Sequence, residues 1–255
     1  MNMDEKSPAA AGHTAPESLR RRPRASFPLL RQIFLVVLSL LVIYNVYKVR
    51  VPRERLKQTL QPLAPKRVPL EIHNIVKCPN AQVALTALVL PTIERVHDKV
   101  DFRLSILARE TEEGMHCKHG PEECKAAMME LCTQDTHRDS RSLVGFLECL
   151  TNEYQRIPER AHYEACAAKN SIDLEKVDQC AARDGGAYAY ELLRKSAQRT
   201  IDAGVHISGT IRLNEKVYCI RDGDNDTWLE CPNGPGVDEL VDAIERLYNA
   251  TTEEL

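Results

Sequence analysis

Residues 68–80 read Val-Pro-Leu-Glu-Ile-His-Asn-Ile-Val-Lys-Cys-Pro-Asn. Apolar and polar side chains alternate over the first half, which is typical of a β-strand. The last four residues predict a turn, and residues 82–96 then carry an apolar face at helical spacing, with a kink expected at Pro91. Residues 101–107 alternate again. This order predicts one βαβ unit, with Cys78 at the turn between its first strand and its helix.

The rest of the chain predicts a helical block followed by a hairpin and a last helix. The candidate helices are 122–131, 140–154, 160–169, 173–182 and 188–203, and the candidate strands are 206–213 and 216–221. Residues 237–248 carry an apolar stripe on one helix face. This element order is that of an α/β thioredoxin-like fold with an inserted helical block at about 117–203, inside a folded domain at 67–250.

The amino-terminal part predicts a membrane anchor. Residues 1–31 are polar and basic, so we expect a disordered tail. An uncharged stretch of 16 residues follows at 32–47, and it would span roughly 24 Å as a helix. No small-residue cleavage site follows it, so an uncleaved signal anchor at 32–49 is expected. Basic side chains flank both ends and leave its orientation open. Residues 50–66, with three prolines, predict a stalk.

The cysteines indicate the compartment. All nine follow residue 77, and eight lie between 117 and 231, a density typical of oxidising environments. Two N-glycosylation triplets, at Asn225 and Asn249, agree with this reading. Together with the anchor they predict a type II single-pass protein, with its domain in the lumen of the secretory or endo-lysosomal (vacuolar) pathway.

Eight cysteines can form four disulfides and leave Cys78 alone. Cys219 and Cys231 flank a turn-rich stretch, so a disulfide between them would close a hairpin. The other six allow several connectivities, and their spacing does not choose among them: Cys117, Cys124, Cys132, Cys149, Cys166 and Cys180.

Charge and composition exclude one class of partner. Residues 1–60 hold 11 basic and 4 acidic side chains, which leaves 23 basic and 33 acidic for the rest of the chain. An acidic domain is repelled by phosphates, and aromatic residues, at 5%, are too few for base stacking. No nucleic-acid partner is expected.

One segment carries a family signature. Residues 117–132 read Cys-Lys-His-Gly-Pro-Glu-Glu-Cys-Lys-Ala-Ala-Met-Met-Glu-Leu-Cys. This resembles the gamma-interferon-inducible lysosomal thiol reductase family, whose signature is Cys-Gln-His-Gly-x-x-Glu-Cys-x-x-Asn-x-x-Glu-x-Cys. Lys118 and Ala127 depart from it. The matching residues are Cys117, His119, Gly120, Glu123, Cys124, Glu130 and Cys132. The resemblance covers roughly residues 68–248, looks most like fungal members, and implies a thiol-disulfide oxidoreductase that acts on protein disulfides.

The chain departs from the family at the reactive turn. The family's reductases use a Cys-x-x-Cys pair there, and here Cys78 fills the first position while Ala81 fills the second. Fungal relatives can place a second cysteine six residues on, where this chain has Ala84. Gly209 aligns near the cis-proline that faces the active cysteine in thioredoxin folds. The resemblance therefore implies a degenerate site with Cys78 as its lone nucleophile.

Two functions follow as hypotheses. In the first, helix N–H groups, together with Lys77 and His73, stabilise the Cys78 thiolate, which attacks a disulfide, and glutathione or another thiol resolves the product. In the second, Cys78 is inert, and the domain is a lumenal module for binding or folding assistance.

The signature segment also has a metal-binding reading. His116, Cys117, His119 and Cys124 are zinc-ligand types at plausible spacing. Disulfides are commoner than metal sites in a lumenal domain, so we predict neither a metal nor a cofactor. We expect His119-Gly120 to form a structural turn. Glu123 and Glu130 lie seven residues apart on one helix face, which we expect to be solvated, with no acid–base role.

Overall fold

The chain divides into two compact units, Met1–Pro62 and Leu63–Leu255. The computed structural model describes residues 28–59, 66–223 and 227–253. In the first unit, α1 (Pro28–Thr59) is one helix, and its stretch Arg31–Lys48 is long and apolar enough to cross a membrane, with a mean hydropathy of 1.4. The helix continues to Thr59, so the first part of the predicted stalk is helical. The predicted tail, up to residue 27, lies outside the described residues.

The second unit contains the strands and the remaining helices. Its strands are β1 (Val68–Asn74), β2 (Val100–Ile106), β3 (Arg109–Thr111), β4 (Gly114–His116), β5 (Thr210–Leu213), β6 (Lys216–Asp222) and β7 (Thr227–Leu229). Its α-helices are α2 (Pro79–Ala84), α3 (Leu90–Val96), α4 (Pro121–Thr136), α5 (Ser140–Asn152), α6 (Arg160–Asn170), α7 (Leu174–Ala182), α8 (Ala187–Asp202) and α9 (Val237–Glu253).

The main sheet has five strands in the order β2-β1-β5-β6-β7. β1 and β2 pair in parallel, and each later pairing is antiparallel. The helical segment 79–96 connects the parallel pair, as the predicted βαβ unit requires, and α4 to α8 are inserted before β5. A parallel pair followed by an antiparallel hairpin and a last helix is the arrangement of a thioredoxin fold, so the predicted fold class is confirmed.

The crossover helix differs in detail from its prediction. It begins at Pro79 rather than at residue 82, because proline needs no hydrogen-bond acceptor in the first turn of a helix. A π-helical turn at Leu85–Val89 separates α2 from α3. Pro91 follows directly and has no N–H to donate to the preceding turn, so the expected irregularity takes the form of this wider turn.

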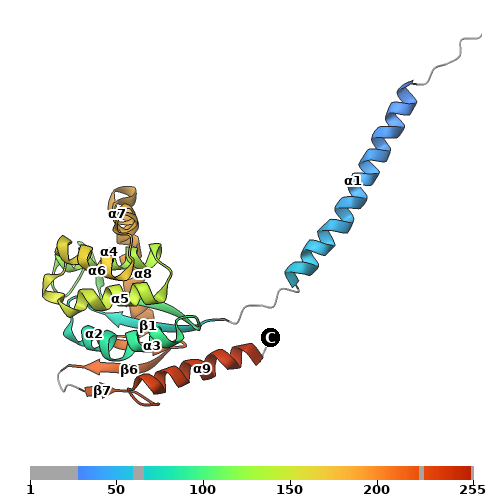
Figure 1. Ribbon diagram of the computed structural model, residues 1–255. Helices are drawn as coiled ribbons and strands as arrows, with labels where there is room; N and C mark the ends of the chain where they lie inside the picture. The colour runs from blue at the N-terminus through green and yellow to red at the C-terminus, as the bar shows by residue number, and fades with distance from the viewer. Residues whose placement is uncertain (1–27, 60–65, 224–226, 254–255) are drawn as a thin grey trace, which may run out of the picture. The chain divides into compact units, whose positions relative to one another are not determined.

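Helices cover the sheet and one another. α9 packs against α3 and β1, α8 packs along β2, and α4 contacts both α7 and α8. α5 contacts α6 and the crossover helix, so the inserted block forms one group of helices, α4 to α8 (Figure 1). The core lies between these layers, where Leu70 and Ile72 of β1 and Leu104 of β2 are buried.

The strand expected at 206–213 begins only at Thr210, because residues 203–209 form the loop that reaches the site described below.

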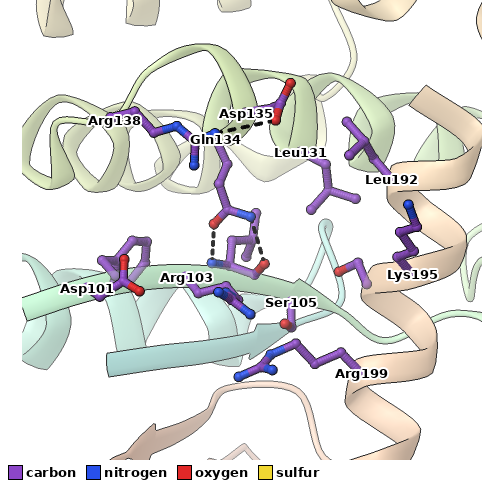
Figure 2. Close-up of a pocket in the computed structure, with 13 residues that line it drawn as sticks. Asp101, Arg103, Ser105, Leu131, Gln134, Asp135, Arg138, Leu192, Lys195 and Arg199 are labelled. Atoms are coloured by element: carbon purple, nitrogen blue, oxygen red, sulfur yellow. Dashed lines mark hydrogen bonds and ion pairs between the residues drawn. The ribbon is translucent and has the colours of Figure 1, made fainter. Parts of the chain in front are cut away.

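Side chains cover the outer edge of β2, which is an edge strand of the sheet. The Gln134 amide accepts from the Leu104 N–H at 2.6 Å and donates to its carbonyl at 3.2 Å (Figure 2). Ser196 Oγ accepts from the Ile106 N–H at 2.9 Å, and Thr200 Oγ1 donates to the Ile106 carbonyl at 3.1 Å. These bonds occupy groups that would otherwise be open to pairing with another strand.

A buried ion cluster joins three parts of the domain. Glu71 of β1 accepts from Arg199 of α8, from Arg212 of β5 at 2.9 Å and from Ser105 of β2. Burial alone would raise the pKa of Glu71, but hydrogen bonds from His73, Arg199 and Ser105 outweigh it and hold that pKa well below its ordinary value. The Glu71 carboxylate is therefore charged in the folded protein at neutral pH.

Candidate active site

Cys78 lies in the turn between β1 and α2. Its backbone is extended, with φ −105° and ψ 124°, and it caps the helix that Pro79 begins. The Cys78 N–H donates to the Ile75 carbonyl at 3.2 Å, and the Cys78 carbonyl accepts from the Gln82 N–H at 3.2 Å. The thiol is free and half-buried. The turn between strand and helix thus presents one free, partly exposed thiol.

The other eight cysteines are paired. The disulfides are Cys117–Cys124, Cys132–Cys180, Cys149–Cys166 and Cys219–Cys231. The last is the pair expected from the turn-rich stretch between its cysteines, and the other three resolve the pairing that spacing left open. The zinc reading of the signature segment fails, because Cys117 and Cys124 bond to each other and leave no thiolate for a metal.

Neither candidate position near Cys78 supplies a second thiol. Ala81 and Ala84 both lie on the crossover helix, and both side chains are fully buried. A mixed disulfide on Cys78 therefore has no resolving cysteine on this helix.

Gly209 approaches the reactive turn from the loop that precedes β5. Its φ is +87°, its N–H donates to the His73 carbonyl at 2.9 Å, and its carbonyl accepts from the Arg221 N–H at 3.1 Å. A Cβ at this position would lie 3.2 Å from the Asn80 carbonyl oxygen, two residues after Cys78. Gly209 therefore lies close to the turn that contains Cys78, where the resemblance to thioredoxin folds predicted it. A proline would not fit this backbone, because its φ is fixed near −65° and it has no N–H.

The signature segment holds the reactive turn through Glu123. This carboxylate is buried and accepts from the Lys77 N–H at 3.1 Å, from the His119 N–H at 2.7 Å and from His119 Nδ1 at 2.8 Å. His119-Gly120 is a turn, in which Gly120 has φ +92° and caps α4. The expectation of a solvated Glu123 was wrong, because α4 packs this side against the segment before Cys78. The sequence pattern did not predict that Glu123 would hold the turn before Cys78. Its match to the family signature was the only sign that Glu123 is important.

Glu130 also departs from the predicted solvated face. It is buried, and its Oε1 has no hydrogen-bond partner among the described residues. Burial, together with the charge of Glu123, raises the pKa of Glu130 well above its ordinary value. Burial likewise raises the pKa of Tyr163. The Glu130 carboxyl is therefore held neutral under the helical block.

The two cationic side chains expected beside Cys78 differ in their contacts. His73 Nδ1 lies 3.0 Å from Thr200 Oγ1, and its Nε2 lies 3.4 Å from Glu71 Oε2, so the ring is turned into the buried ion cluster. The predicted role of His73 beside the thiol has no support in these contacts. Lys77 directly precedes Cys78 and is half-buried, with its backbone held by Glu123.

The glycosylation candidates are only partly described. Asn249 is exposed on α9, and Asn225 lies outside the described residues.

Several solved structures are similar to the chain at low identity. Wolbachia pipientis alpha-DsbA1 is 14% identical with a TM-score of 0.44, over 76% of this chain and 91% of that one. BdbD from Bacillus subtilis (oxidised) is 19% identical with a TM-score of 0.42, over 71% and 88%. MdbA, a thiol-disulfide oxidoreductase from Corynebacterium matruchotii, is 15% identical with a TM-score of 0.43, over 60% and 77%. These scores are too low to carry a conclusion about chemistry.

The family comparison covers both the reactive turn and the signature segment. No curated protein matches the chain. Residues 69–170 match the family model described as gamma interferon inducible lysosomal thiol reductase (GILT). The match includes Cys78, the disulfide Cys117–Cys124 and the Glu123 that joins the two segments. Over residues 69–170 the domain is therefore similar to this family of thiol reductases.

Proposed function

We propose that the domain acts on protein disulfides through Cys78 as its single nucleophile. The observation that carries this proposal is the state of the nine cysteines: eight are paired, and the one free thiol caps the helix that follows β1.

The reaction needs an external thiol. The Cys78 thiolate attacks one sulfur of a substrate disulfide, forms a mixed disulfide and releases the other substrate sulfur as a thiolate. A thiol such as glutathione then attacks the Cys78 sulfur, which releases the second substrate thiolate. A second glutathione frees Cys78 and leaves as oxidised glutathione. One substrate disulfide is thus reduced while two thiols are oxidised to one disulfide.

The test compares the wild-type full chain with Cys78→Ser, both purified in detergent. Each is mixed with a disulfide-linked reporter protein and glutathione, and the rate of reporter reduction is measured. We expect the rate above the glutathione background to vanish in Cys78→Ser, with a mixed disulfide on Cys78 found by peptide mass spectrometry in the wild type. Peptide mapping of the four other disulfides shows that the variant is folded. Equal rates in the two proteins would disprove the nucleophile proposal.

The second candidate is an inactive binding or folding-assistance module. The buried methyl groups of Ala81 and Ala84, and glycine at 209, favour it, because together they remove the second thiol and the expected proline. This candidate predicts that Cys78→Ser binds unfolded polypeptides as well as the wild type does, and that neither protein reduces the reporter.

We further propose that the protein is a type II single-pass membrane protein. The segments are a cytosolic tail at 1–31, an anchor at 32–49, a stalk at 50–66 and a lumenal domain at 67–250. The apolar helix, the four disulfides and the match of residues 69–170 to the family model support a secretory or endo-lysosomal location.

A further inference from the structure

A groove of about 540 Å³ opens at the end of β2. Its apolar floor includes Leu107 and the buried Val205. Its exposed rim is formed by four side chains with N–H donors: Arg109, His116, Lys118 and His206. These residues come from three places: the hairpin β3–β4 with the chain that leads into it, the signature segment, and the loop before β5.

Leu107 of the groove floor and close neighbours of two rim residues bond to the short segment that leads into Cys78. The bonds are Leu107 N–H to the Asn74 carbonyl at 2.9 Å, Ile75 N–H to Ser208 Oγ at 2.8 Å, and Lys77 N–H to Glu123 Oε1 at 3.1 Å. Leu107 is on the floor, Ser208 follows His206 by two residues, and Glu123 also holds His119, the neighbour of Lys118. The groove and the reactive turn thus share the same supporting segment.

The rim carries unpaired basic side chains. Arg109, His116, Lys118 and His206 have no hydrogen-bond or ion-pair partner within residues 66–223 and 227–253, and no acidic residue from these ranges lines the groove. The domain as a whole has an excess of acidic side chains, so a positive groove on it is unexpected from composition.

The cavity beside β2 provides the contrast. It measures about 270 Å³ and also contains basic side chains (Figure 2). There Arg199 binds Glu71, Lys195 lies 3.5 Å from Glu191, and Arg138 lies 3.7 Å from Asp135. Those three charges are already balanced within the protein, which leaves Arg103 as the one unpaired basic side chain among the described residues of that cavity. In the groove, all four basic side chains of the rim lack an anionic partner among the described residues.

We propose that the groove binds an acidic segment of the substrate polypeptide next to the disulfide that Cys78 attacks. This inference rests on the proposed function and gives its substrate a chemical class. Carboxylates of the substrate pair with the Arg109 and Lys118 side chains and accept hydrogen bonds from the two imidazoles. The apolar floor lowers the local dielectric and strengthens the attraction inside the groove.

The test measures binding without thiol chemistry. The full chain carries Cys78→Ser in a neutral detergent, so that no covalent capture contributes. Two fluorescent peptides of equal length each contain one internal disulfide, flanked by glutamates in one peptide and by lysines in the other. We expect the acidic peptide to bind about tenfold more tightly or better at low salt, with a difference that shrinks as salt is added.

Charge reversal locates the binding. The double variant Arg109→Glu/Lys118→Glu should weaken binding of the acidic peptide by about tenfold. The matched control is Arg103→Glu, since Arg103 is exposed, lines the other cavity and has no partner among the described residues. This control should change the affinity by less than about twofold.

Two outcomes would overturn the inference: equal affinity for the two peptides, or full affinity of the double variant for the acidic peptide. These outcomes are separate from failure of the proposed function. If Cys78→Ser abolishes reporter reduction but the affinity does not depend on peptide charge, Cys78 remains the nucleophile and the groove does not bind acidic segments. If the wild type reduces nothing but binds acidic peptides through this rim, the groove belongs to a binding module.

Discussion

At the residue scale, the chemistry depends on one thiol and two alanines. Cys78 is free and half-buried at a helix start, whereas Ala81 puts a buried methyl group at the second position of the Cys-x-x-Cys pair, and Ala84 is buried further along the same helix. The first half of thiol–disulfide exchange needs only the thiolate, and the second half needs another thiol. Under the proposed function, the chain would therefore carry out the first step with its own thiol and would need an external thiol for the second.

A second thiol introduced beside Cys78 should give the site a resolving cysteine of its own. In Ala81→Cys the new sulfur lies one helical turn from Cys78, within the reach of a disulfide. We expect a disulfide between Cys78 and the introduced cysteine in the oxidised full chain. We also expect reporter reduction roughly tenfold faster at low glutathione, because an intramolecular thiol replaces a bimolecular step. Peptide mass spectrometry and the reduction assay measure the two effects.

Ala84→Cys is the matched control for this experiment, since Ala84 is equally buried on the same helix. Its Cα lies about 9 Å from that of Cys78 along the helix axis, beyond the usual reach of a disulfide. Acceleration by Ala84→Cys as large as that by Ala81→Cys would contradict the assigned geometry.

Glu130 makes stability depend on pH. Its pKa is raised in the folded protein by burial, so folding favours the protonated form, and this contribution is lost as the pH rises above the ordinary value of 4.5. Glu130→Gln removes the titration. We expect the free energy of unfolding of the wild type to fall relative to this variant as the pH rises from 4.5 toward the raised pKa of Glu130. Denaturant unfolding at several pH values measures the difference.

The difference between the two proteins is the informative quantity, because Glu71 acts in the opposite direction. Its lowered pKa gives stability that is present above its ordinary value of 4.5 and is lost as the pH falls. Parallel pH curves for the wild type and Glu130→Gln would show that Glu130 is not held neutral by its surroundings.

At the element scale, three segments far apart in sequence meet at the reactive turn. β1 leads into Cys78, the start of α4 holds the Lys77 N–H through Glu123, and the loop before β5 places Gly209 against Asn80. The disulfide Cys117–Cys124 closes the signature segment on itself, so the carboxylate is presented from a short closed loop. The position of the thiol is thus set by the helical insertion as well as by the sheet.

Glu123→Gln tests this link. The amide keeps one acceptor oxygen and loses the other, so at least one buried N–H of Lys77 or His119 loses its partner. We expect unfolding to become easier by about 1–3 kcal/mol, and alkylation of Cys78 to change in rate because its turn is released. The comparison is Glu122→Gln, since Glu122 is exposed and pairs with Lys125 at 2.6 Å. That variant should cost at most about 1 kcal/mol, and equal effects of the two variants would remove the special role of Glu123.

At the scale of the whole molecule, the chain combines an apolar helix with a disulfide-rich domain. The anchor candidate Arg31–Lys48 belongs to the first unit, and every cysteine belongs to the second. Disulfides persist in oxidising compartments, so a domain with four of them is expected on the lumenal side.

Glycan analysis tests this orientation. The full chain made in the presence of microsomal membranes should gain mass that an N-glycosidase removes, and Asn225→Gln and Asn249→Gln should each remove part of it. Protease added to sealed vesicles should cleave the tail and spare the domain. An unglycosylated, protease-sensitive domain would place it in the cytosol instead.

Local patterns were enough for most elements of the fold. Alternation and helical spacing predicted β1, β2, β6 and α5 to α9, and most of their ends lie within two residues of the prediction. These signals arise because each element buries one face, which requires a period of about two or 3.6 residues. β3, β4 and β7 have three residues each, too few to show a period, and they went unpredicted.

The amino-acid order alone located Cys78 at a strand–helix turn, the missing second thiol, the anchor candidate and the signature that resembles the family. The tertiary structure decided what these residues touch: Glu123 and Glu130 buried rather than solvated, His73 turned toward Glu71, and the pairing of six cysteines. The physical reason is that burial and pairing depend on neighbours brought together by folding. A carboxylate on a helix has the same local pattern whether solvent or another segment lies opposite it.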